Sequence, residues 1–210
     1  VGSRSIAFYR LPLPDNAKTY ESRLKTKQRN NIRRYRKQLS GQEDLRLKNL
    51  RDLMSPEEVF TVLENLHSQR WLSKGETGAF ERNPKFREFL KAYTVRASKL
   101  GQIAAFCLFQ GPKPIAIRFG FTYNNTMYEI QSGFDPSLNG AGLASIDMAI
   151  KAAISDHIEV YDFLAFEGEY KQRFGAIKKP GKRLFAIKKN LLGWLVTRAG
   201  LWPTGRYIQM

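Results

Sequence analysis

Apolar and polar positions between residues 126 and 171 form the clearest pattern in the chain. Residues 127–133 mix Tyr, Ile and Met with polar positions, as a β-strand does. From residue 143 to residue 154 the apolar residues recur at helical spacing. Residues 159–164 then read as a second, short strand. Between the first strand and the helix, four residues mark a turn: Pro136, Asn139, Gly140 and Gly142.

This strand, turn, helix and strand unit predicts either a ligand site or a turn whose glycines are needed for steric reasons alone. The two strands should lie parallel, and ligands favour the crevice beyond the carboxyl ends of such strands. Glycines at a helix start leave backbone N–H groups free, and these groups with the helix dipole can bind a phosphate or pyrophosphate. The dinucleotide fingerprint GxGxxG is absent, because Ser145 stands where its third glycine would be. The phosphate loop that ends in Gly-Lys-Ser/Thr is absent as well.

The segments upstream of this unit predict one strand followed by two helices. Residues 44–50 alternate as a short strand, and Ser55 to Glu58 form a capping box with Pro56 at the first helical position. Asn83, followed by Pro84, caps the second helix. We expect these side chains to face inward: Val59, Val62, Leu63, Leu66 and Trp71 on the first helix, and Phe86, Phe89, Leu90 and Tyr93 on the second.

Three strands in a meander connect these helices to the ligand unit. Residues 102–110 and 114–122 are apolar strands around a turn, and a second turn leads into the strand of Glu129. Beyond the ligand unit, residues 170–174 suggest one or two helical turns and residues 183–189 a last strand. The order is β-α-α-β-β-β-α-β-α-β. It predicts an α/β (α+β) fold with a mixed, mostly antiparallel central sheet flanked by helices.

Residues 17–39 predict an additional, basic amphipathic helix at the N-terminus. Its apolar stripe is Leu24, Ile32, Tyr35 and Leu39, and its cations are Arg23, Lys25, Lys27, Arg29, Arg33, Arg34, Arg36 and Lys37. The whole chain carries a net charge of +16, which implies an anionic partner or surface. Residues 23–37 could bind anionic lipid or RNA, or could be the solvated face of a helix packed on the core.

The composition is that of one globular domain. The 210 residues are 42% hydrophobic and 26% charged, enough for a substantial core. We expect residues 1–43 to be an N-terminal extension, residues 44–189 the core, and residues 190–210 an apolar tail too short to span a bilayer. The tail could pack on the core, on a missing domain or on a membrane surface. Because the first residue is Val1, we expect the chain to be part of a longer protein.

The single cysteine and the two histidines narrow the chemistry. Cys107 lies in the apolar run QIAAFCLF, which favours inert packing and a cytoplasmic setting, with a membrane-peripheral one left open. The chain has no signal-peptide region and no apolar run of transmembrane length. His67 and His157 lie far apart, so no metal site is expected, and no Ser-His-Asp signature occurs.

The turn Asn139-Gly140-Ala141-Gly142-Leu143-Ala144 resembles the Q/R-x-x-G-x-G/A turn of the GNAT acetyltransferase superfamily, with Asn139 where Gln or Arg is usual. Other segments resemble the CelD-type, cellulose-biosynthesis-associated branch: SRLKTKQRNNIRRYRK, HSQRW, GETGAF, GFDP, and YDFL ahead of YK. The resemblance implies that the turn binds the pyrophosphate of acetyl-CoA or another acyl-CoA. The implied cofactor-binding residues are Gln131, Gly133, Asn139, Gly140, Ala141, Gly142, Leu143 and Ala144.

Transfer of an acyl group from a thioester to an amine needs a base, donors for the oxyanion and an acid for the thiolate. Glu129 lies mid-strand, where a carboxylate is unfavourable unless it faces a cleft or has a partner. The resemblance puts the general base on this strand. It also implies that Tyr170 stands about where the superfamily often has a tyrosine that protonates the departing thiolate. Asp162 and Lys171 are the other catalytic candidates, with the alternatives that Asp162 simply caps or pairs and that a water relay replaces a direct base, as in many enzymes of this superfamily. His67, Arg70 and Trp71 are implied to border the acceptor site. Phe166 departs from the glycine expected there.

Three functions are compatible with these residues. The first is an acyl-CoA-dependent N-acyltransferase that acts on an unknown amine-bearing acceptor, most simply by acetyl transfer. The second keeps the fold but takes its donor from aminoacyl-tRNA, as the related Fem-type transferases do, which would suit the basic helix. The third is a catalytically degenerate domain that docks at a membrane or a polymer-synthesis complex.

Overall fold

The computed structural model describes residues 2–41, 44–165 and 168–185. Its centre is a seven-stranded sheet with the strand order β2-β3-β4-β5-β6-β1-β7. Strands β5 and β6 pair in parallel, and the other neighbours pair antiparallel. The mixed, mostly antiparallel sheet that we expected is therefore confirmed. The strands are β1 (Gly2–Pro12), β2 (Leu45–Asn49), β3 (Ile103–Gln110), β4 (Lys113–Tyr123), β5 (Thr126–Phe134), β6 (Val160–Ala165) and β7 (Ile177–Phe185).

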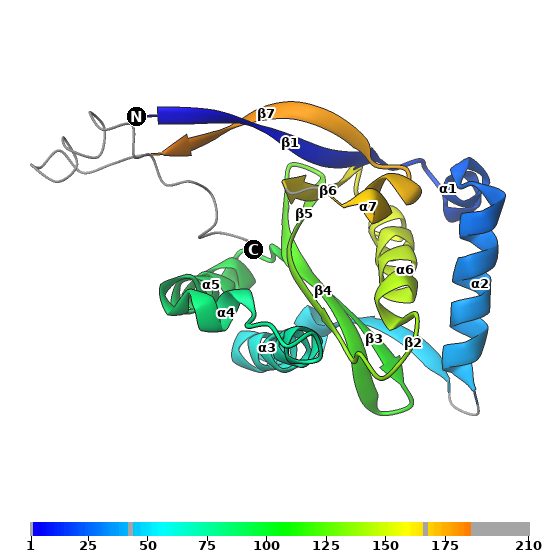
Figure 1. Cartoon of the computed structure of the whole chain (residues 1–210), viewed down its shortest axis with the longest axis horizontal. Coiled ribbons are helices and arrows are strands. Elements are labelled where there is room, and N and C mark those ends of the chain that lie inside the picture. Colours follow the sequence, from blue (N-terminus) through cyan, green and yellow to red (C-terminus); the bar gives the residue numbers. More distant parts are fainter. Residues whose placement is uncertain (1, 42–43, 166–167, 186–210) are drawn as a thin grey trace, which may run out of the picture.

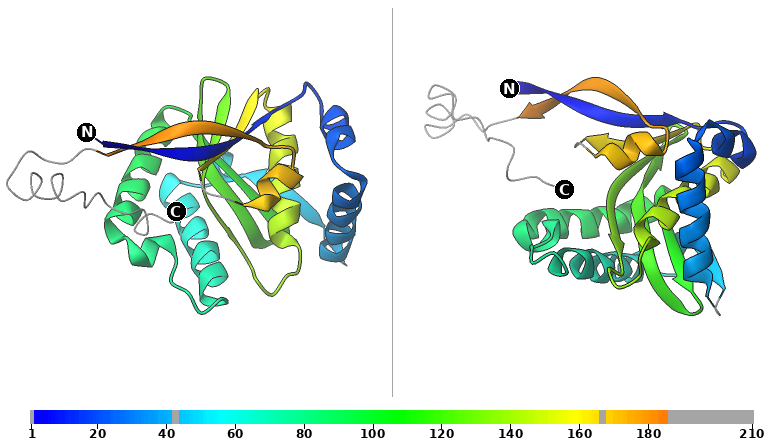
Figure 2. Two further views of the ribbon diagram at one scale, coloured as in Figure 1. Left: turned by 45° about the horizontal axis from the view of Figure 1, so that its top comes forward. Right: turned by 45° about the vertical axis from the view of Figure 1, so that its right-hand side comes forward.

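Helices cover both faces of the sheet. Figure 1 shows α3, α4 and α5 on one side of strands β3 to β5, and α6 with α1 and α2 on the other. The long pair of β1 and β7 arches over this body, and both views in Figure 2 show these two strands side by side. The helices are α1 (Ala17–Arg23), α2 (Thr26–Ser40), α3 (Pro56–Leu72), α4 (Ala79–Arg82), α5 (Pro84–Lys99), α6 (Ala141–Ser155) and α7 (Glu169–Arg173), with a 3-10 turn η1 (Leu50–Asp52).

Local capping signals place the starts of α3 and α5 as expected. The Ser55 hydroxyl accepts from the Glu58 N–H, and the Glu58 carboxylate accepts from the Ser55 N–H at 2.8 Å, which completes the capping box. The Asn83 side chain accepts from the Phe86 N–H at 3.1 Å. Both caps satisfy N–H groups that the helix itself leaves free.

The basic N-terminal segment is two helices, not one. Leu24 and Lys25 adopt extended backbone angles between α1 and α2. The Arg29 guanidinium donates to the carbonyls of Glu21, Ser22 and Leu24, the last at 2.9 Å. Carbonyls at a helix end lack partners within the helix, so this arginine satisfies them from the next helix and stabilises the break.

Strand β1 is the element that sequence analysis missed. We expected residues 1–43 to lie outside the core, but β1 occupies the sheet between β6 and β7. The last strand also differs from expectation, because β7 begins at Ile177 and not at residue 183. Residues 186–189 of the predicted strand and the whole predicted tail, 190–210, lie outside the described residues.

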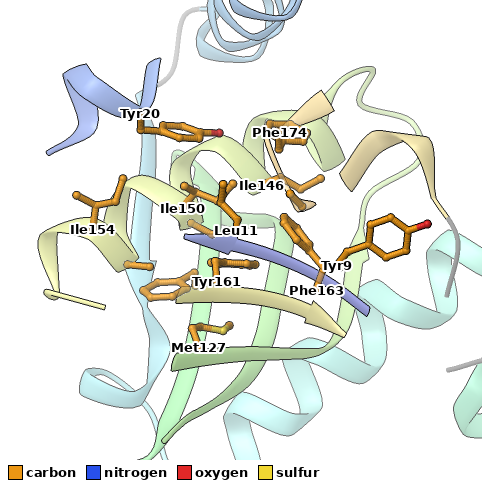
Figure 3. Packing of buried hydrophobic residues seen from close by; sticks show 14 of the residues in the cluster. Tyr9, Leu11, Tyr20, Met127, Ile146, Ile150, Ile154, Tyr161, Phe163 and Phe174 are labelled. Carbon is orange, nitrogen blue, oxygen red and sulfur yellow. The ribbon is translucent and has the colours of Figure 1, made fainter. Parts of the chain in front are cut away.

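Two apolar layers hold the fold together. On one face, Ile146, Ile150 and Ile154 of α6 pack over Met127 and Tyr161 of the parallel strands, as Figure 3 shows. On the other face, Phe60, Leu63 and Leu66 of α3 and Leu90 of α5 pack on β3 and β4. The expected inward positions on α5 are partly wrong: Phe89 is 61% and Tyr93 36% exposed, and their rings stack on each other at the surface.

Candidate functional site

The parallel strands β5 and β6 part after three paired residues and open a cleft. Their pairing ends at Tyr128 and Asp162. The register between β4 and β5 shifts at Ile130, and such a bulge bends a strand. Leu164 near the end of β6 has a left-handed backbone angle of 57°. The resulting cleft has a volume of about 350 Å³ and lies among β5, β6, α7, the end of α3 and the β1–β7 pair.

Glu129 is the acidic group of this cleft, and both of its oxygens are engaged. Oε1 accepts from the Arg118 guanidinium at 3.1 Å, and Oε2 accepts from the Tyr161 hydroxyl at 2.6 Å. The side chains of Arg118 and Glu129 are only 5% and 7% exposed. Burial and the Glu129 charge raise the pKa of Tyr161, so its hydroxyl remains a donor. Glu129 thus has the partners that a mid-strand carboxylate requires.

Arg118 connects this carboxylate to the start of α6. Its Nη2 donates to the Gly142 carbonyl at 2.6 Å, and its Nε donates to the Ser145 hydroxyl at 3.1 Å. One guanidinium therefore contacts β5 and the first turn of α6 at once. This fork geometry is available to arginine and not to lysine.

His67 ties α3 to β5 and to α4. The Ala79 N–H donates to Nε2 at 3.1 Å, so the ring proton sits on Nδ1, which faces the Ser132 carbonyl at 3.2 Å. Burial lowers the pKa of His67, which keeps the ring neutral. Both nitrogens are thus used in positioning α3 and α4, and His67 lines the cleft without a free basic nitrogen.

Arg70 and Trp71 follow on the same helix and line the cleft. The Arg70 guanidinium lies over the rings of Trp71 and Phe134, at 5.4 and 5.2 Å, and its Nη1 donates to the Ser132 hydroxyl at 3.1 Å. Burial, and then the charge of Arg118, lower the pKa of Arg70. Gln131 of β5 also lines the cleft and is 5% exposed.

The catalytic candidates after β6 take different positions. Tyr170 lines the cleft, and burial followed by the Glu129 charge raises the pKa of its hydroxyl. Lys171 also lines it, but its ammonium donates to the Phe163 and Ala165 carbonyls at 3.0 and 2.9 Å. Burial lowers the pKa of Lys171. The lysine therefore holds the end of β6 in place.

Asp162 is not a cleft residue. One oxygen pairs with the Arg10 guanidinium of β1 at 3.1 Å, and the other accepts from the Leu164 N–H at 2.8 Å. The second bond stabilises the left-handed turn at Leu164, so the Asp162 carboxylate holds the end of β6 in shape. Burial raises the pKa of Asp162. Phe166, the other departure noted above, lies outside the described residues.

The glycine turn has the free donors that were expected, but part of it is covered. Gly140 has a backbone φ of 84°, and a Cβ there would overlap the ring of Tyr35 from α2. The N–H groups of Gly142 and Leu143 find no acceptor within the described part of the chain, whereas those of Ala141 and Ala144 bond to carbonyls. Within this turn, the donors left for the expected anion are thus the N–H groups of these two residues. Of the remaining turn residues, Asn139 is exposed.

Gly133 has a packing role in place of the expected contact with a cofactor. A Cβ at this position would overlap the backbone of Leu66 and His67, so the glycine lets α3 approach β5. Of the two cofactor-binding residues expected on this strand, Gln131 lines the cleft and Gly133 does not.

Residues 26–172 match the model of a family described as an acetyltransferase (GNAT) domain. That span covers well over half of the chain. The chain belongs to the GNAT acetyltransferase domain family. No curated protein matches the sequence. Membership identifies the domain as a transferase of the acyl-transfer kind.

Solved structures share the fold of this GNAT domain at low sequence identity. FemX matches with a TM-score of 0.60 and 9% identity, over 82% of this chain and 59% of that one. A conserved protein of unknown function from Bacteroides thetaiotaomicron matches with a TM-score of 0.58 and 15% identity, over 86% of this chain and 60% of that one. The C-terminal domain of a putative lysylphosphatidylglycerol synthetase from Agrobacterium fabrum matches with a TM-score of 0.54 and 12% identity, over 86% of this chain and 60% of that one. The chain thus spans about three fifths of each of these structures.

Among the described residues, no group of His, Cys, Asp and Glu side chains is suited to a metal ion. No helix in residues 2–41, 44–165 and 168–185 is both long enough and apolar enough to cross a bilayer.

Among the residues that sequence reasoning missed are three polar ones that bond to Glu129 or Arg70: Arg118, Ser132 and Tyr161. Arg118 could have been found, because it is the one charge in the apolar strand IAIRFGF, which signals a buried partner. Tyr161 and Ser132 carry no such signal, since a tyrosine or serine in a strand is ordinary.

Proposed function

We propose that this GNAT domain is an acyl-CoA-dependent N-acyltransferase whose reaction takes place in the cleft between β5 and β6. The observation that carries the proposal is the parting of the two strands beyond Tyr128 and Asp162. An unpaired strand edge offers N–H and C=O groups to an extended chain that carries amides. The pantetheine arm of CoA is such a chain, and backbone N–H groups at the bulge can stabilise the thioester oxyanion.

Tyr170 is the acid of this mechanism. A group that protonates a departing thiolate must hold its proton at neutral pH and lie in the cleft. Burial and the nearby Glu129 charge raise the pKa of Tyr170, which meets the first requirement, and its position on the cleft wall meets the second. The C–S bond breaks as the amine nitrogen forms the amide, and the sulfur takes the tyrosine proton.

Glu129 has a positioning role in this proposal. Its two oxygens accept from Arg118 and Tyr161, so taking up the amine proton directly would remove the negative charge that strengthens these two buried bonds. Its charge keeps the hydroxyl protons of Tyr161 and Tyr170 in place. The role of general base, which we expected for Glu129, passes in this proposal to water in the cleft.

The donor's pyrophosphate would lie at the free N–H groups of Gly142 and Leu143. These groups stand at the N-terminus of a 15-residue helix, where the dipole favours an anion. The matched variants Gly142→Asp and Gly142→Asn test this placement by calorimetry with acetyl-CoA. The three atoms nearest to a Cβ at position 142 belong to the Phe134 ring, the closest at 3.1 Å, whereas a Cβ at Gly140 would collide with the Tyr35 ring.

Both variants are expected to fold, since aspartate and asparagine suit the first turn of a helix. We expect Gly142→Asp to bind acetyl-CoA at least tenfold more weakly than Gly142→Asn, because only the aspartate repels the pyrophosphate. Equal affinities would place the pyrophosphate elsewhere. If the parent protein gives no heat of binding with acetyl-CoA, CoA is not the donor. The function left is then the catalytically degenerate binding module, which sedimentation with anionic vesicles tests.

A donor of the aminoacyl-tRNA kind is the second candidate, and one surface favours it. Arg33, Arg34, Arg36 and Lys37 are exposed on α2. Beside them, a hollow of about 590 Å³ between α1, α2 and α7 carries Arg23, Lys25, Lys27 and Arg173. Replacing the four α2 cations with Gln should weaken tRNA binding and flatten its salt dependence, because each phosphate contact releases counterions. Filter binding between low and moderate salt measures both.

The finer expectations about identity and setting stay predictions. They are membership of the CelD-type branch, acetyl as the transferred group and a cytoplasmic or membrane-peripheral setting.

A further inference from the structure

Among the described residues, the Arg70 guanidinium in the cleft has no carboxylate of its own. Arg70 is half-buried, and within the described residues it forms no ion pair. The nearby carboxylate, Glu129, is held by Arg118 and Tyr161. The two guanidinium groups of Arg70 and Arg118 therefore share one carboxylate. Withdrawing a charge from water without a counter-ion is costly, so Arg70 has the properties of an anion-binding residue.

Three N–H donors on the same cleft wall lack acceptors. They are Nε of Arg70, Nε1 of Trp71 and Nε2 of Gln131, each buried and without a hydrogen-bond partner in the part of the chain that the structure describes. Gln131 is 95% buried, so water satisfies it poorly. A buried donor without a partner is uncommon in folded proteins, and three on one wall indicate a ligand rich in acceptor oxygens.

We infer that Arg70, Trp71 and Gln131 bind a carboxylate of the acceptor substrate. This inference rests on the proposed function, because it names the acceptor of that reaction. A carboxylate oxygen can accept from a guanidinium N–H, and the remaining lone pairs suit the indole and amide N–H groups. One carboxylate offers about four acceptor positions on its two oxygens, which is enough to satisfy the three N–H donors.

The acceptor is then an amine that also carries a carboxylate, such as an amino acid or a short peptide. Its carboxylate lies against the end of α3, and its amine faces the parted strands, where Tyr170 stands. Arg70 and Trp71 come from α3 and Gln131 from β5, so the carboxylate bridges the two elements that form the acceptor side of the cleft.

Nuclear magnetic resonance of the full chain tests the inference without any donor. The probe is the indole N–H signal of Trp71, assigned by its absence from the Trp71→Phe variant. Acetate, acetamide and inorganic phosphate are titrated separately at constant ionic strength. We expect acetate to move this signal saturably and acetamide of the same shape to leave it in place, because only acetate supplies a charged acceptor.

Two variants and a matched control assign the effect to the named residues. Arg70→Gln should weaken acetate binding at least about tenfold, the scale of one charged hydrogen bond. Gln131→Leu should weaken it severalfold. Lys74→Gln removes the same charge from a residue that is exposed and lies over the same Trp71 ring, at 5.2 Å, but does not line the cleft. We expect Lys74→Gln to bind within twofold of the parent.

Three results would overturn the inference. They are equal responses to acetate and acetamide, an equal loss in Lys74→Gln and Arg70→Gln, and phosphate binding more than tenfold tighter than acetate. If Arg70→Gln does not fold, the comparison of acetate with acetamide in the parent and the Gln131→Leu variant still decide. Failure here leaves acetyl-CoA binding unaffected, and failure of acetyl-CoA to bind leaves the acetate titration valid, so the two proposals are tested separately.

Discussion

Arg118→Lys is the sharpest test of how the cleft is built. Arg118 bonds through three nitrogens to the Ser145 hydroxyl, the Glu129 carboxylate and the Gly142 carbonyl, and it is 4% exposed. Lysine keeps the charge, but its single nitrogen cannot span partners on β5 and on α6. We expect it to retain the ion pair with Glu129 and to lose the other two bonds.

The size of the loss follows from the kind of bond. A hydrogen bond to a charged group contributes about 1.5 to 3 kcal/mol, so two such bonds at the lower value give a loss of about 3 kcal/mol. For a domain of this size, each kcal/mol lowers the melting temperature by about 2 to 4 °C, so we expect a fall of about 6 to 12 °C. Urea unfolding followed by circular dichroism measures the free energy, and calorimetry measures the melting temperature.

The control uses an arginine in an exposed ion pair. Arg46 lies 2.6 Å from Asp44, with side chains 64% and 75% exposed. Exposed pairs contribute about 0 to 1 kcal/mol, so Arg46→Lys should be within about 0.5 kcal/mol of the parent. If Arg118→Lys is as stable as Arg46→Lys, the three-way contact does not hold α6 against β5 and the reasoning fails.

Three other variants or reactions test separate groups. Tyr170→Phe should lower turnover by about 10²- to 10⁴-fold with little change in acetyl-CoA affinity, and by less with donors whose leaving group needs no proton; steady-state kinetics decides. Burial raises the pKa of Asp147, so ionisation of this carboxyl opposes folding. The parent should therefore lose stability as the pH rises above about 3.9, the pKa of an unperturbed Asp. Asp147→Asn should lack that loss when urea unfolding is measured from pH 4 to 7. Burial raises the pKa of Cys107 to about 12, so a thiol reagent should label it only at the rate of unfolding, and rapid labelling of the native protein would contradict its burial.

The elements that were predicted correctly carry their signals locally. The α3 start needs only Ser55, Pro56 and Glu58, which lie within four residues of each other. Strand β1 was not predicted because its pairing partner is distant in the sequence. Gly2 to Arg10 pair with Phe185 to Ile177 near the other end of the described chain. The break between α1 and α2 has no glycine or proline to announce it, and depends on the Arg29 contacts, which only the folded chain brings together.

Candidate site residues were chosen from similarly local signals, but the contacts of each one depend on distant parts of the chain. A charged residue in a strand needs a partner or a cleft, and the sequence alone cannot tell which. Glu129 has both, because Arg118 and Tyr161 bind its oxygens at the point where β5 leaves β6. Asp162 has partners, the Arg10 guanidinium and the Leu164 N–H, but it does not line the cleft. The sequence left open that Asp162 simply caps or pairs, and its partner Arg10 lies on β1, the strand that was missed.

The acceptor side of the cleft depends on a glycine that touches no ligand. Gly133 lets the backbone of α3 come against β5 at Leu66 and His67. His67 then fixes this approach through its bonds to the Ser132 carbonyl and the Ala79 N–H. Arg70 and Trp71 follow one turn later on the same helix, so their distance from Gln131 is determined by that contact. A helix held this closely to a strand keeps the donors that we assign to the carboxylate ordered before any ligand arrives, which lowers the entropic cost of binding.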